Sequence, residues 1–472
     1  MTVDMPIAHA EGALETAIDA LQSSLRGELL GPGDAGYDAA RKVHNGMIDR
    51  HPRLIARCRD VADVIAAVAF AREMELPLAI RSGGHNAAGF GTVDGGIVID
   101  LSSMKGIRVD AAARTVRVET GCTWGDVDHA THAFGLATPN GFVSTTGVGG
   151  LTLGGGIGHL SRRYGLTIDS LLSADLVLAD ASVVTASPDQ HPDLFWAIRG
   201  GGGNFGIVTS FLFRLHPVDT VVGGPMLWPI DRAAEVLRWY RDFLPAAPED
   251  LSGFFAFLKV PPGPPFPEEL WTTTACGIVW CFTGPLPDAE DRFASVRSSA
   301  LGPPLVDLVG EVPFPAFQAM FDPLLPAGIQ SYWRADFVGV LTDDAIDRHV
   351  EHGSNLPTLL STMHLYPMDG AVRRVGRNDT AFSHRDVNWL ETIVGFDMDP
   401  ANAGLIRDWT VAYWEALHPL SEPGAYVNFM MDEGVDRVRA TYRDNLPRLV
   451  EVKTRYDPTN FFRINQNIAP MV

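Results

Sequence analysis

The order of apolar and polar residues in the first half of the chain predicts alternating helices and strands. Apolar residues recur at helical spacing over residues 60–77, behind Asp60 and before Pro77, which ends the helix. A short run, LAIR at 78–81, then predicts a strand. The next predicted elements are strands at 95–102 and 115–121 and a helix at about 123–134. Such alternation is typical of an α/β domain.

The pattern changes at about Pro217. Proline-rich stretches at 260–270 and 302–315 separate β-like runs such as GFFAFLKV (253–260) and CGIVWCF (276–282). We therefore place a domain boundary near residue 217. The last fifty residues predict a strand at 425–430, a helix at 436–456 and an extended tail at 457–470.

Length and charge restrict the classes of protein. A chain of 472 residues exceeds the usual size of one core, so we expect two substantial units. Hydrophobic residues at 46% and charged residues at 20% are typical of a globular protein. A formal net charge of -20 disfavours nucleic acid and anionic membranes as partners. A small anionic cofactor remains possible, because backbone N–H groups in glycine-rich loops bind phosphates.

Targeting and metal signals are weak. The four scattered cysteines lack the spacing of zinc ligands, and we interpret them as reduced packing residues. Residues 1–26 carry acidic side chains and no apolar stretch, which excludes a secretory signal, and no segment is apolar enough to span a bilayer. The expected location is the cytoplasm, and no metal site is expected.

Two glycine-rich loops carry the candidate chemistry. In RSGGHN (81–86), paired glycines would let backbone amides approach a pyrophosphate, and His85 could bond to an electrophilic cofactor carbon or simply bind a backbone carbonyl. Residues 145–158 contain seven glycines among fourteen residues. This density indicates a backbone lying against a ligand or crossing another strand. The pattern differs from the GxGxxG fingerprint, so a nicotinamide dinucleotide site is the weaker interpretation.

Several motifs together resemble the berberine bridge enzyme family of vanillyl-alcohol-oxidase-type flavoproteins. They are RSGGHN at 81–86, TGVGGLTLGGGIGHLSRRYGLTIDSL at 146–171, DLFWAIRGGGGNFGIVTSF at 193–211, YVNFMMDEG at 426–434 and FFRINQNI at 461–468. The match runs from about Val43 to Pro470 in family order. It implies an α+β fold of two domains. In this fold, residues 1–216 and the returning segment 425–472 form an FAD domain of two α/β subdomains. Residues 217–424 form a substrate domain with an antiparallel sheet and covering helices.

The resemblance also implies where FAD binds. His85 would carry the flavin 8α-methyl bond, the loops at 81–86 and 145–158 would hold the pyrophosphate and ribityl chain, and Gly206 to Val208 would border the adenine. Val143 stands where members with two covalent links carry cysteine, so we expect one covalent bond. The full predicted cofactor set is Arg81, Ser82, Gly83, Gly84, His85, Asn86, Gly89, Gly141, Val143, Thr145, Gly147, Gly149, Gly150, Thr152, Gly155, Gly156, Gly158, Gly206, Ile207, Val208, Asn465 and Asn467.

The resemblance implies an oxidase that transfers hydride from a small organic substrate to FAD and then passes electrons to molecular oxygen, giving hydrogen peroxide. The substrate would be an alcohol, an amine or a natural-product intermediate. Two alternatives stay open: a flavin dehydrogenase with another acceptor, and a flavin-binding protein without turnover. Sequence patterns do not define the oligomeric state.

Two family positions bear on which residue acts as the catalytic base. Many members use the second tyrosine of a Tyr-x-Asn-Tyr motif, but this chain has Phe429 there, which cannot take a proton. The resemblance implies a second candidate, Glu391, because plant-type members place a catalytic glutamate seven residues after the His of a His-Arg element like the one here. Glu391 shares a strand face with Trp389 and Ile393. That apolar setting would raise its pKa into the range useful for a base, whereas a solvent-facing position would leave it inert.

Further candidates for the substrate site follow from the same motifs. Tyr426 aligns with a substrate-side tyrosine and is expected to orient the substrate, and His364 and Tyr366 precede a family-like turn. Aromatic residues of the middle domain could line an apolar pocket or simply pack in the core. They are Phe254, Phe255, Phe257, Tyr332 and Trp333.

Overall fold

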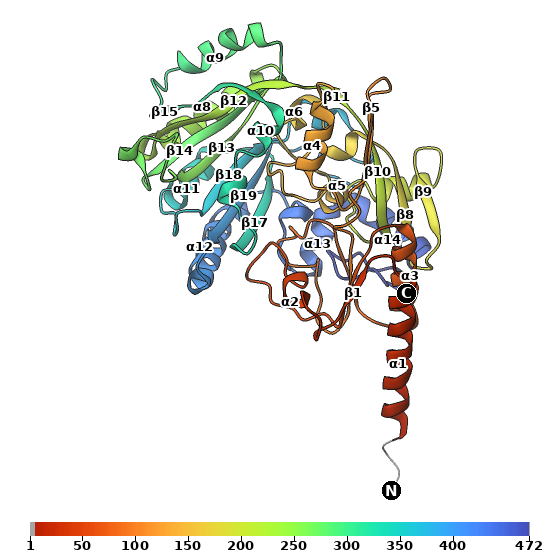
Figure 1. Cartoon of the computed structure of the whole chain (residues 1–472). Helices are drawn as coiled ribbons and strands as arrows, with labels where there is room; N and C mark the ends of the chain where they lie inside the picture. The colour runs from red at the N-terminus through yellow and green to blue at the C-terminus, as the bar shows by residue number, and fades with distance from the viewer. Residues whose placement is uncertain (1–4, 472) are drawn as a thin grey trace.

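A computed structural model describes residues 5–471 of the chain. Its strands form three main sheets, and Figure 1 shows the largest sheet with its helices at one end of the molecule and the N-terminal sheets at the other. The chain returns to the N-terminal sheets at its end, where α13 and α14 lie. Within residues 5–471, no helix combines the length and apolarity that crossing a bilayer requires.

The first sheet positions the first glycine-rich loop. Its strand order is β1 (Glu28–Leu30), β2 (Leu54–Arg57), β4 (Ile97–Asp100) and β3 (Leu78–Arg81), and the last three are parallel. Helix α3 (Val61–Glu73) connects β2 to β3 and begins behind Asp60, whose carboxylate accepts hydrogen bonds from two N–H groups of the first turn. The predicted helix and strand are confirmed. Residues 81–86 therefore follow the carboxyl end of a buried parallel strand.

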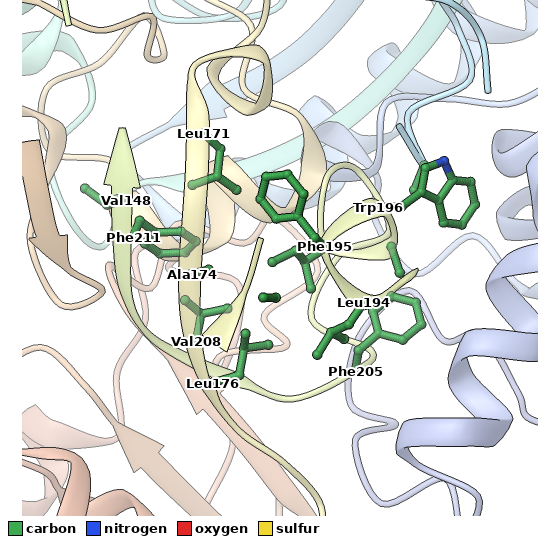
Figure 2. Close-up of a cluster of buried hydrophobic side chains, with 14 of the residues drawn as sticks. Val148, Leu171, Ala174, Leu176, Leu194, Phe195, Trp196, Phe205, Val208 and Phe211 are labelled. Atoms are coloured by element: carbon green, nitrogen blue, oxygen red, sulfur yellow. The ribbon is translucent and has the colours of Figure 1, made fainter. Parts of the chain in front are cut away.

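The second sheet positions the second loop. It is antiparallel, in the order β5 (Ile107–Asp110), β6 (Thr115–Glu119), β10 (Ile207–Arg214), β8 (Leu171–Val177) and β9 (Val183–Ala186). Its helices are α4 (Trp124–His132), α5 (Val148–Gly154), α6 (Ser161–Tyr164) and α7 (Pro192–Ala197). Phe211 of β10 and Phe195 of α7 belong to one buried cluster, shown in Figure 2, which also includes Val148 at the start of α5. This packing holds the glycine-rich segment against the sheet.

The third sheet has eight antiparallel strands, in agreement with the predicted antiparallel substrate sheet. The order is β15 (Val306–Asp307), β12 (Thr220–Pro229), β14 (Thr274–Phe282), β13 (Leu251–Lys259), β18 (Thr362–Pro367), β19 (Trp389–Asp397) and β17 (Gln330–Val338), and β16 (Gly310–Pro313) pairs with β12. The helices of this part are α8 (Ala233–Ala246), α9 (Ala289–Arg297), α10 (Phe314–Gln318), α11 (Asp343–Gly353) and α12 (Ala403–Leu417).

Side chains alternate between the two faces of this sheet because successive residues of a strand point to opposite sides. Phe255 and Phe257 of β13 pack with side chains of α8, α11 and α12. Phe254 and Ala256 belong to the cluster on the other face. Helices α8, α11 and α12 therefore cover one face, and the other face is turned toward α10 and the N-terminal part of the chain.

The C-terminal segment departs from two predictions. The predicted strand at 425–430 is wrong, because Val427–Phe429 forms a single 3₁₀ turn. The helix predicted at 436–456 is two helices, α13 (Val435–Tyr442) and α14 (Leu446–Tyr456). The break lies at Arg443, whose φ of 46° is left-handed, and Pro447 lies in the first turn of α14. Apolar spacing alone does not reveal such a break.

The remaining elements are short, apart from the first helix. α1 (Met5–Ser24) extends from the body of the molecule (Figure 1), and its C-terminal half packs on the cluster that includes α3, where Leu21 is buried. The others are α2 (Tyr37–Ala40), β7 (Leu136–Ala137) and β11 (His216–Pro217). The chain passes from one sheet to another after β11, because β11 pairs with β7 and the next strand, β12, belongs to the third sheet. The predicted boundary near 217 coincides with this change, and the domain limits themselves stay a prediction.

Candidate active site

One large cavity of about 730 Å³ lies where the two glycine-rich loops, the third sheet and the C-terminal tail meet. It is the place to which most of the predicted site residues converge. The predicted residues that line it are Arg81, Ser82, Gly83, Gly84, His85, Asn86, Gly141, Val143, Gly147, Gly149, Gly150, Gly206, Ile207, Val208, His364, Tyr426 and Asn465. Residues separated by almost four hundred positions thus share one wall.

The two loops are in direct contact with each other. A Cβ on Gly83 would collide with the backbone of Gly147, and a Cβ on Gly147 would collide with the backbone of Gly83. Ser82 Oγ donates to the carbonyl of Thr120 at 2.5 Å and accepts from Gly149 N–H at 3.4 Å. Some of these glycines therefore allow two backbone segments to touch. This agrees with the alternative that the glycine-rich segment crosses another part of the chain.

The first loop also presents free donors to the cavity. Gly84 has a left-handed φ of 71°, which turns the backbone sharply. Among the described residues, none accepts a hydrogen bond from the N–H groups of residues 83–86. Four consecutive unpaired N–H groups on a cavity wall form an anion-binding concavity of the kind that holds a pyrophosphate. Gly150 and Gly203 also line the cavity, and a Cβ on either would meet only open space, so a ligand can lie flat against them.

Arg81 lines the cavity but does not supply it with a free charge. Its guanidinium donates to Asp100 at 2.7 Å and to the Lys42 carbonyl at 3.2 Å, and both Arg81 and Asp100 are buried. The ion pair joins β3 to β4 just before the loop. Arg81 therefore has a structural role in addition to its predicted contact with the cofactor.

His85 lies on the cavity wall with two specific neighbours. Its Nε2 is 3.2 Å from Thr145 Oγ1, and its ring stacks on His44 with centroids 4.0 Å apart and an interplanar angle of 26°. Burial and, secondarily, the neighbouring His44 lower the pKa of His85 to about 3. The imidazole is therefore neutral at physiological pH and keeps a nitrogen lone pair, which a nucleophile requires.

The C-terminal tail contributes one predicted residue and one that the sequence interpretation missed. Asn465 and Gln466 line the cavity, and the side-chain oxygen of Asn465 is buried without a hydrogen-bond partner among the described residues. A buried polar atom without a partner at a cavity wall indicates a ligand group that completes it. Asn467 does not line the cavity. Free N–H groups, open glycines and this amide together fit a dinucleotide cofactor such as FAD.

Several other predicted cofactor residues do not line the cavity. They are Gly89, Thr145, Thr152, Gly155, Gly156, Gly158 and Asn467. Gly156 donates its N–H to Tyr426 and packs on Thr167, while Gly158 lies against the carbonyls of residues 140 and 141. The second half of the glycine-rich run therefore permits close packing inside the protein, and Thr145 acts on His85 instead.

On the opposite wall, the third sheet supplies a pair of polar side chains. The hydroxyl of Tyr366 lies 2.6 Å from Nδ1 of His364, two residues earlier on the same face of β18. Burial lowers the pKa of His364 to about 3 and raises the pKa of Tyr366. Both groups are therefore neutral, and they share one hydrogen bond whose donor is set by the tautomer of His364.

Aromatic rings enclose this pair. Phe142 stacks on Tyr366 at 4.2 Å, and Phe254 lies 5.0 Å from the ring of His364. Phe429 stacks on Trp333 at 5.3 Å. Phe254 and Trp333 thus line the cavity, while Phe255 and Phe257 pack beneath the helices and Tyr332 lies outside its wall. The pocket in front of the pair favours an apolar substrate group.

Tyr426 lies near the second loop, and its oxygen already accepts two hydrogen bonds. Gly156 N–H and Asn428 Nδ2 both donate to it at 2.8 Å. Burial raises the pKa of Tyr426 to about 12, so the phenol stays protonated. Its position fits an orienting side chain better than a base.

Glu391 does not line the cavity, which contradicts its predicted role as the base. Its face of β19 is the one shared with Trp389 and Ile393, as predicted, but this face packs beneath the helices. Its carboxylate lies 3.4 Å from His349 Nε2 and accepts from Ser421 at 3.2 Å. Burial raises its pKa. Neighbouring Val394 lines the cavity from the opposite face, so the error lies in the choice of face.

The cavity residues that the sequence interpretation missed include His44, Phe142 and Gln466. His44 lies about forty residues before the loop that it contacts, and the parallel pairing of β2 and β3 with β4 places the two segments in one sheet. The sequence could have indicated Phe142, because it lies between Gly141 and Val143, which were both predicted to bind the cofactor. The four cysteines are all buried and free.

Comparison with known proteins agrees with this geometry. Residues 52–187 match the family described as FAD binding domain, and residues 425–469 match the one described as berberine and berberine like. An FAD-linked oxidoreductase of Dictyostelium discoideum is 35% identical over 457 residues, covering 95% of this chain and 96% of that relative.

Two further similarities concern oxidases. (R)-6-hydroxynicotine oxidase of Paenarthrobacter nicotinovorans is 41% identical over 206 residues, which are 43% of this chain and 45% of that enzyme. The crystal structure of 6-hydroxy-D-nicotine oxidase from Arthrobacter nicotinovorans superposes with a TM-score of 0.84 at 28% identity, covering 95% of this chain and 99% of that one.

These similarities and the fold place the protein among the FAD-dependent oxidoreductases, and the predicted α+β flavoprotein fold is confirmed. Within that class, the chain belongs to the berberine bridge enzyme-like family of FAD-linked oxidoreductases.

Proposed function

We propose that the protein is an oxidase that carries FAD on one covalent bond to His85 and oxidises a small, neutral, largely apolar alcohol or amine. The observation that carries the proposal is the neutral Tyr366–His364 pair, held in an aromatic pocket of the same cavity whose other wall holds His85 and the free N–H groups. The two oxidase relatives support an oxidase over a dehydrogenase.

The cofactor would be held by residues already described. The N–H groups of residues 83–86 would bind the pyrophosphate, and Gly150 and Gly203 would allow the backbone to approach it. The unpaired side-chain oxygen of Asn465 would accept a hydrogen bond from an N–H of the flavin ring. FAD, when bound, accepts the hydride and passes two electrons to dioxygen, which gives hydrogen peroxide.

The sheet would hold the substrate. With His364 in the tautomer whose Nδ1 accepts from the Tyr366 hydroxyl, the tyrosine oxygen keeps lone pairs that accept a hydrogen bond from a substrate O–H or N–H. As hydride leaves the adjacent carbon, that proton moves to the Tyr366 oxygen while the tyrosine proton moves to His364 Nδ1. Phe142, Phe254 and Phe429 exclude water from this part of the cavity and favour a neutral substrate.

The cofactor is tested first, by the absorption spectrum of the native protein and the intact mass of the denatured protein. Wild type should be yellow and carry the mass of one FAD, and His85→Ala should lose the added mass. Colourless wild-type protein would contradict the proposal. Neutral aromatic alcohols and cyclic amines are then screened for aerobic peroxide release. Flavin that is reduced by a substrate without peroxide formation would favour a dehydrogenase.

A further inference from the structure

We propose that the substrate carries an extended apolar tail, which lies in a side compartment of the cavity between the Tyr366–His364 pair and strand β12. The inference deepens the proposed function and rests on its assignment of the substrate to this pair. It narrows the substrate class to alcohols or amines with an apolar tail. The side compartment is defined by six residues that line the cavity, namely Leu227, Ala256, Leu258, Phe266, Gly277 and Leu308.

The floor of the side compartment is a row of residues across the third sheet. Ala256 of β13 pairs in register with His364 of β18 on one side and with Gly277 of β14 on the other. Gly277 in turn pairs with Leu227 of β12. Residues that pair directly across antiparallel strands point to the same face, so the row leads from the pair to a leucine. Because neighbouring strands lie about 4.8 Å apart, β12 lies about 14 Å from β18.

Larger side chains border this row. Phe254 and Leu258 lie two positions before and after Ala256, so they stand on the same face of β13. Val279 pairs with Phe254 and continues the border along β14. All three line the cavity. The small side chain of Ala256 between them therefore leaves a trough that begins beside His364.

The far end of the trough is apolar. Leu227 leans over Gly277, where an added Cβ would collide with its Cδ2, and so closes the row. Leu258, Phe266 and Leu308 pack against the cluster that contains Leu227, yet they are only half-buried. Because they line the cavity, part of their apolar surface faces it. Covering that surface with an apolar group of the substrate is favourable.

One charged residue lies near this end of the cavity wall. Lys259 lines the cavity at the end of β13 and directly follows Leu258. Successive residues of a strand point to opposite faces, so the ammonium group of Lys259 belongs to the face opposite the side compartment. The tail that fits here is therefore uncharged.

The cofactor loops approach the other end of the sheet. Asn45 Nδ2 donates to the Ser331 carbonyl of β17 at 3.0 Å and to the Ala87 carbonyl, just after the first glycine-rich loop, at 2.8 Å. In the sheet order, β17 and β12 lie on opposite sides of β18. None of the six residues of the side compartment belongs to the predicted cofactor set. The side compartment is therefore left to the substrate.

The test measures the binding of straight-chain alcohols, from ethanol to 1-octanol, to purified flavin-containing protein without oxygen, by ligand-observed nuclear magnetic resonance titration. Each added methylene that leaves water should lower Kd by about fourfold. Equal Kd values across the series would overturn the inference. The ω-hydroxy acid of the same length as 1-octanol should bind more weakly than 1-octanol. Tighter binding of the acid would show that Lys259 faces the side compartment and would overturn its apolar character.

Two variants locate the binding. Ala256→Leu fills the trough and Leu308→Asn makes its far end polar, so each should weaken 1-octanol binding by about tenfold. Ethanol is too short to reach Leu308, so its Kd should not change in Leu308→Asn. Flavin content equal to that of wild type shows that each variant is folded. Unchanged 1-octanol binding in either folded variant would overturn the proposed location.

The matched control is Leu305→Asn. Leu305 lies on the same segment as Leu308, is 44% exposed and does not line the cavity. Its replacement should leave the binding of ethanol and of 1-octanol unchanged. A loss of 1-octanol binding equal to that of Leu308→Asn would place the alcohol outside the cavity and overturn the inference.

Peroxide release separates this inference from the proposed function. Protein that releases peroxide with a short alcohol or amine, but gains no affinity from a longer tail, would overturn the side compartment and leave the oxidase. Protein whose affinity rises with tail length and falls in Ala256→Leu, but which releases no peroxide with any alcohol or amine, would overturn the oxidase and support the side compartment as a binding site.

Discussion

The hydroxyl of Tyr366 lies 2.6 Å from Nδ1 of His364, and both side chains face the cavity from one strand. Tyr366→Phe keeps the ring that stacks on Phe142 and removes only the hydroxyl. We expect it to slow flavin reduction by about a hundredfold, the lower range for a group that accepts a proton in the transition state. Anaerobic stopped-flow absorbance measures this rate. Unchanged reduction at full flavin content would exclude Tyr366 from proton transfer.

Replacing Glu391 by Gln should have little effect on catalysis, because its carboxylate lies beneath the helices and contacts His349 and Ser421. The rate of flavin reduction should stay within about twofold of wild type, as expected for a residue without contact to the reacting groups. A loss as large as that of Tyr366→Phe would show that the strand reaches the substrate in another arrangement.

The same substitution should change how stability depends on pH. Burial raises the pKa of Glu391 in the folded state above its unfolded value, so the protonated form is favoured in the fold. The corresponding stability is present below the unfolded pKa and is lost as pH rises through the raised folded pKa. Glu391→Gln removes this dependence. Thermal unfolding of both proteins from pH 5 to pH 8 should show wild type losing stability relative to the variant as pH increases.

Ala256 should control the size of the substrate. It lies on the cavity face of β13 and pairs in register with His364 of β18. Ala256→Leu would fill the space beside the Tyr366–His364 pair and raise KM by about tenfold for the best substrate, which corresponds to about 1.4 kcal/mol of binding. The control is Phe255→Leu on the opposite face, where the side chain is fully buried among the helices. It should lower the melting temperature and leave KM unchanged.

A buried ion pair should hold the C-terminal tail at the cavity. Lys453 and Asp457 are both fully buried, and Lys453 Nζ donates to Asp457 at 2.6 Å and to the carbonyls of Asn204 and Phe462. Asp457→Asn would leave the lysine charge uncompensated and cost about 3–5 kcal/mol of stability.

The matched control for this pair is Asp436→Asn, because Asp436 is 94% exposed and its partner Arg439 is 64% exposed. An exposed pair of this kind should cost less than about 1 kcal/mol. Urea unfolding measures both variants, and the flavin that remains bound after gel filtration should fall only in Asp457→Asn. Equal stabilities for the two variants would show that the buried pair does not anchor the tail.

The sequence predicts an element well when the residues that define it lie within one segment, and less well when the element depends on distant parts of the chain. Asp60 and the apolar spacing behind it define α3 closely, because a capping side chain and a buried face are properties of one segment. Phe254 and Phe255 are identical in type and adjacent, yet one lines the cavity and the other packs beneath helices. Which face of a strand is covered depends on segments hundreds of residues away.

The glycine residues also show that the sequence alone does not tell which side chains and backbone segments face the cavity. Gly150 opens to the cavity, whereas Gly156, six residues later, meets the side chain of Thr167. A Cβ on Gly156 would collide with the protein itself, whereas a Cβ on Gly150 would only occupy cavity space that a ligand can use. Resemblance placed both in one cofactor set, and only the three-dimensional arrangement separates them.

The two faces of the third sheet serve two different requirements, the stability of the domain and the choice of substrate. Side chains on its helix face determine how much free energy holds the domain together, while those on its cavity face determine which molecules fit. Because the two sets alternate along the same strands, a change at one position leaves its neighbours' packing largely intact. Such a scaffold can acquire new substrates by successive substitutions on one face without a matching loss of stability on the other.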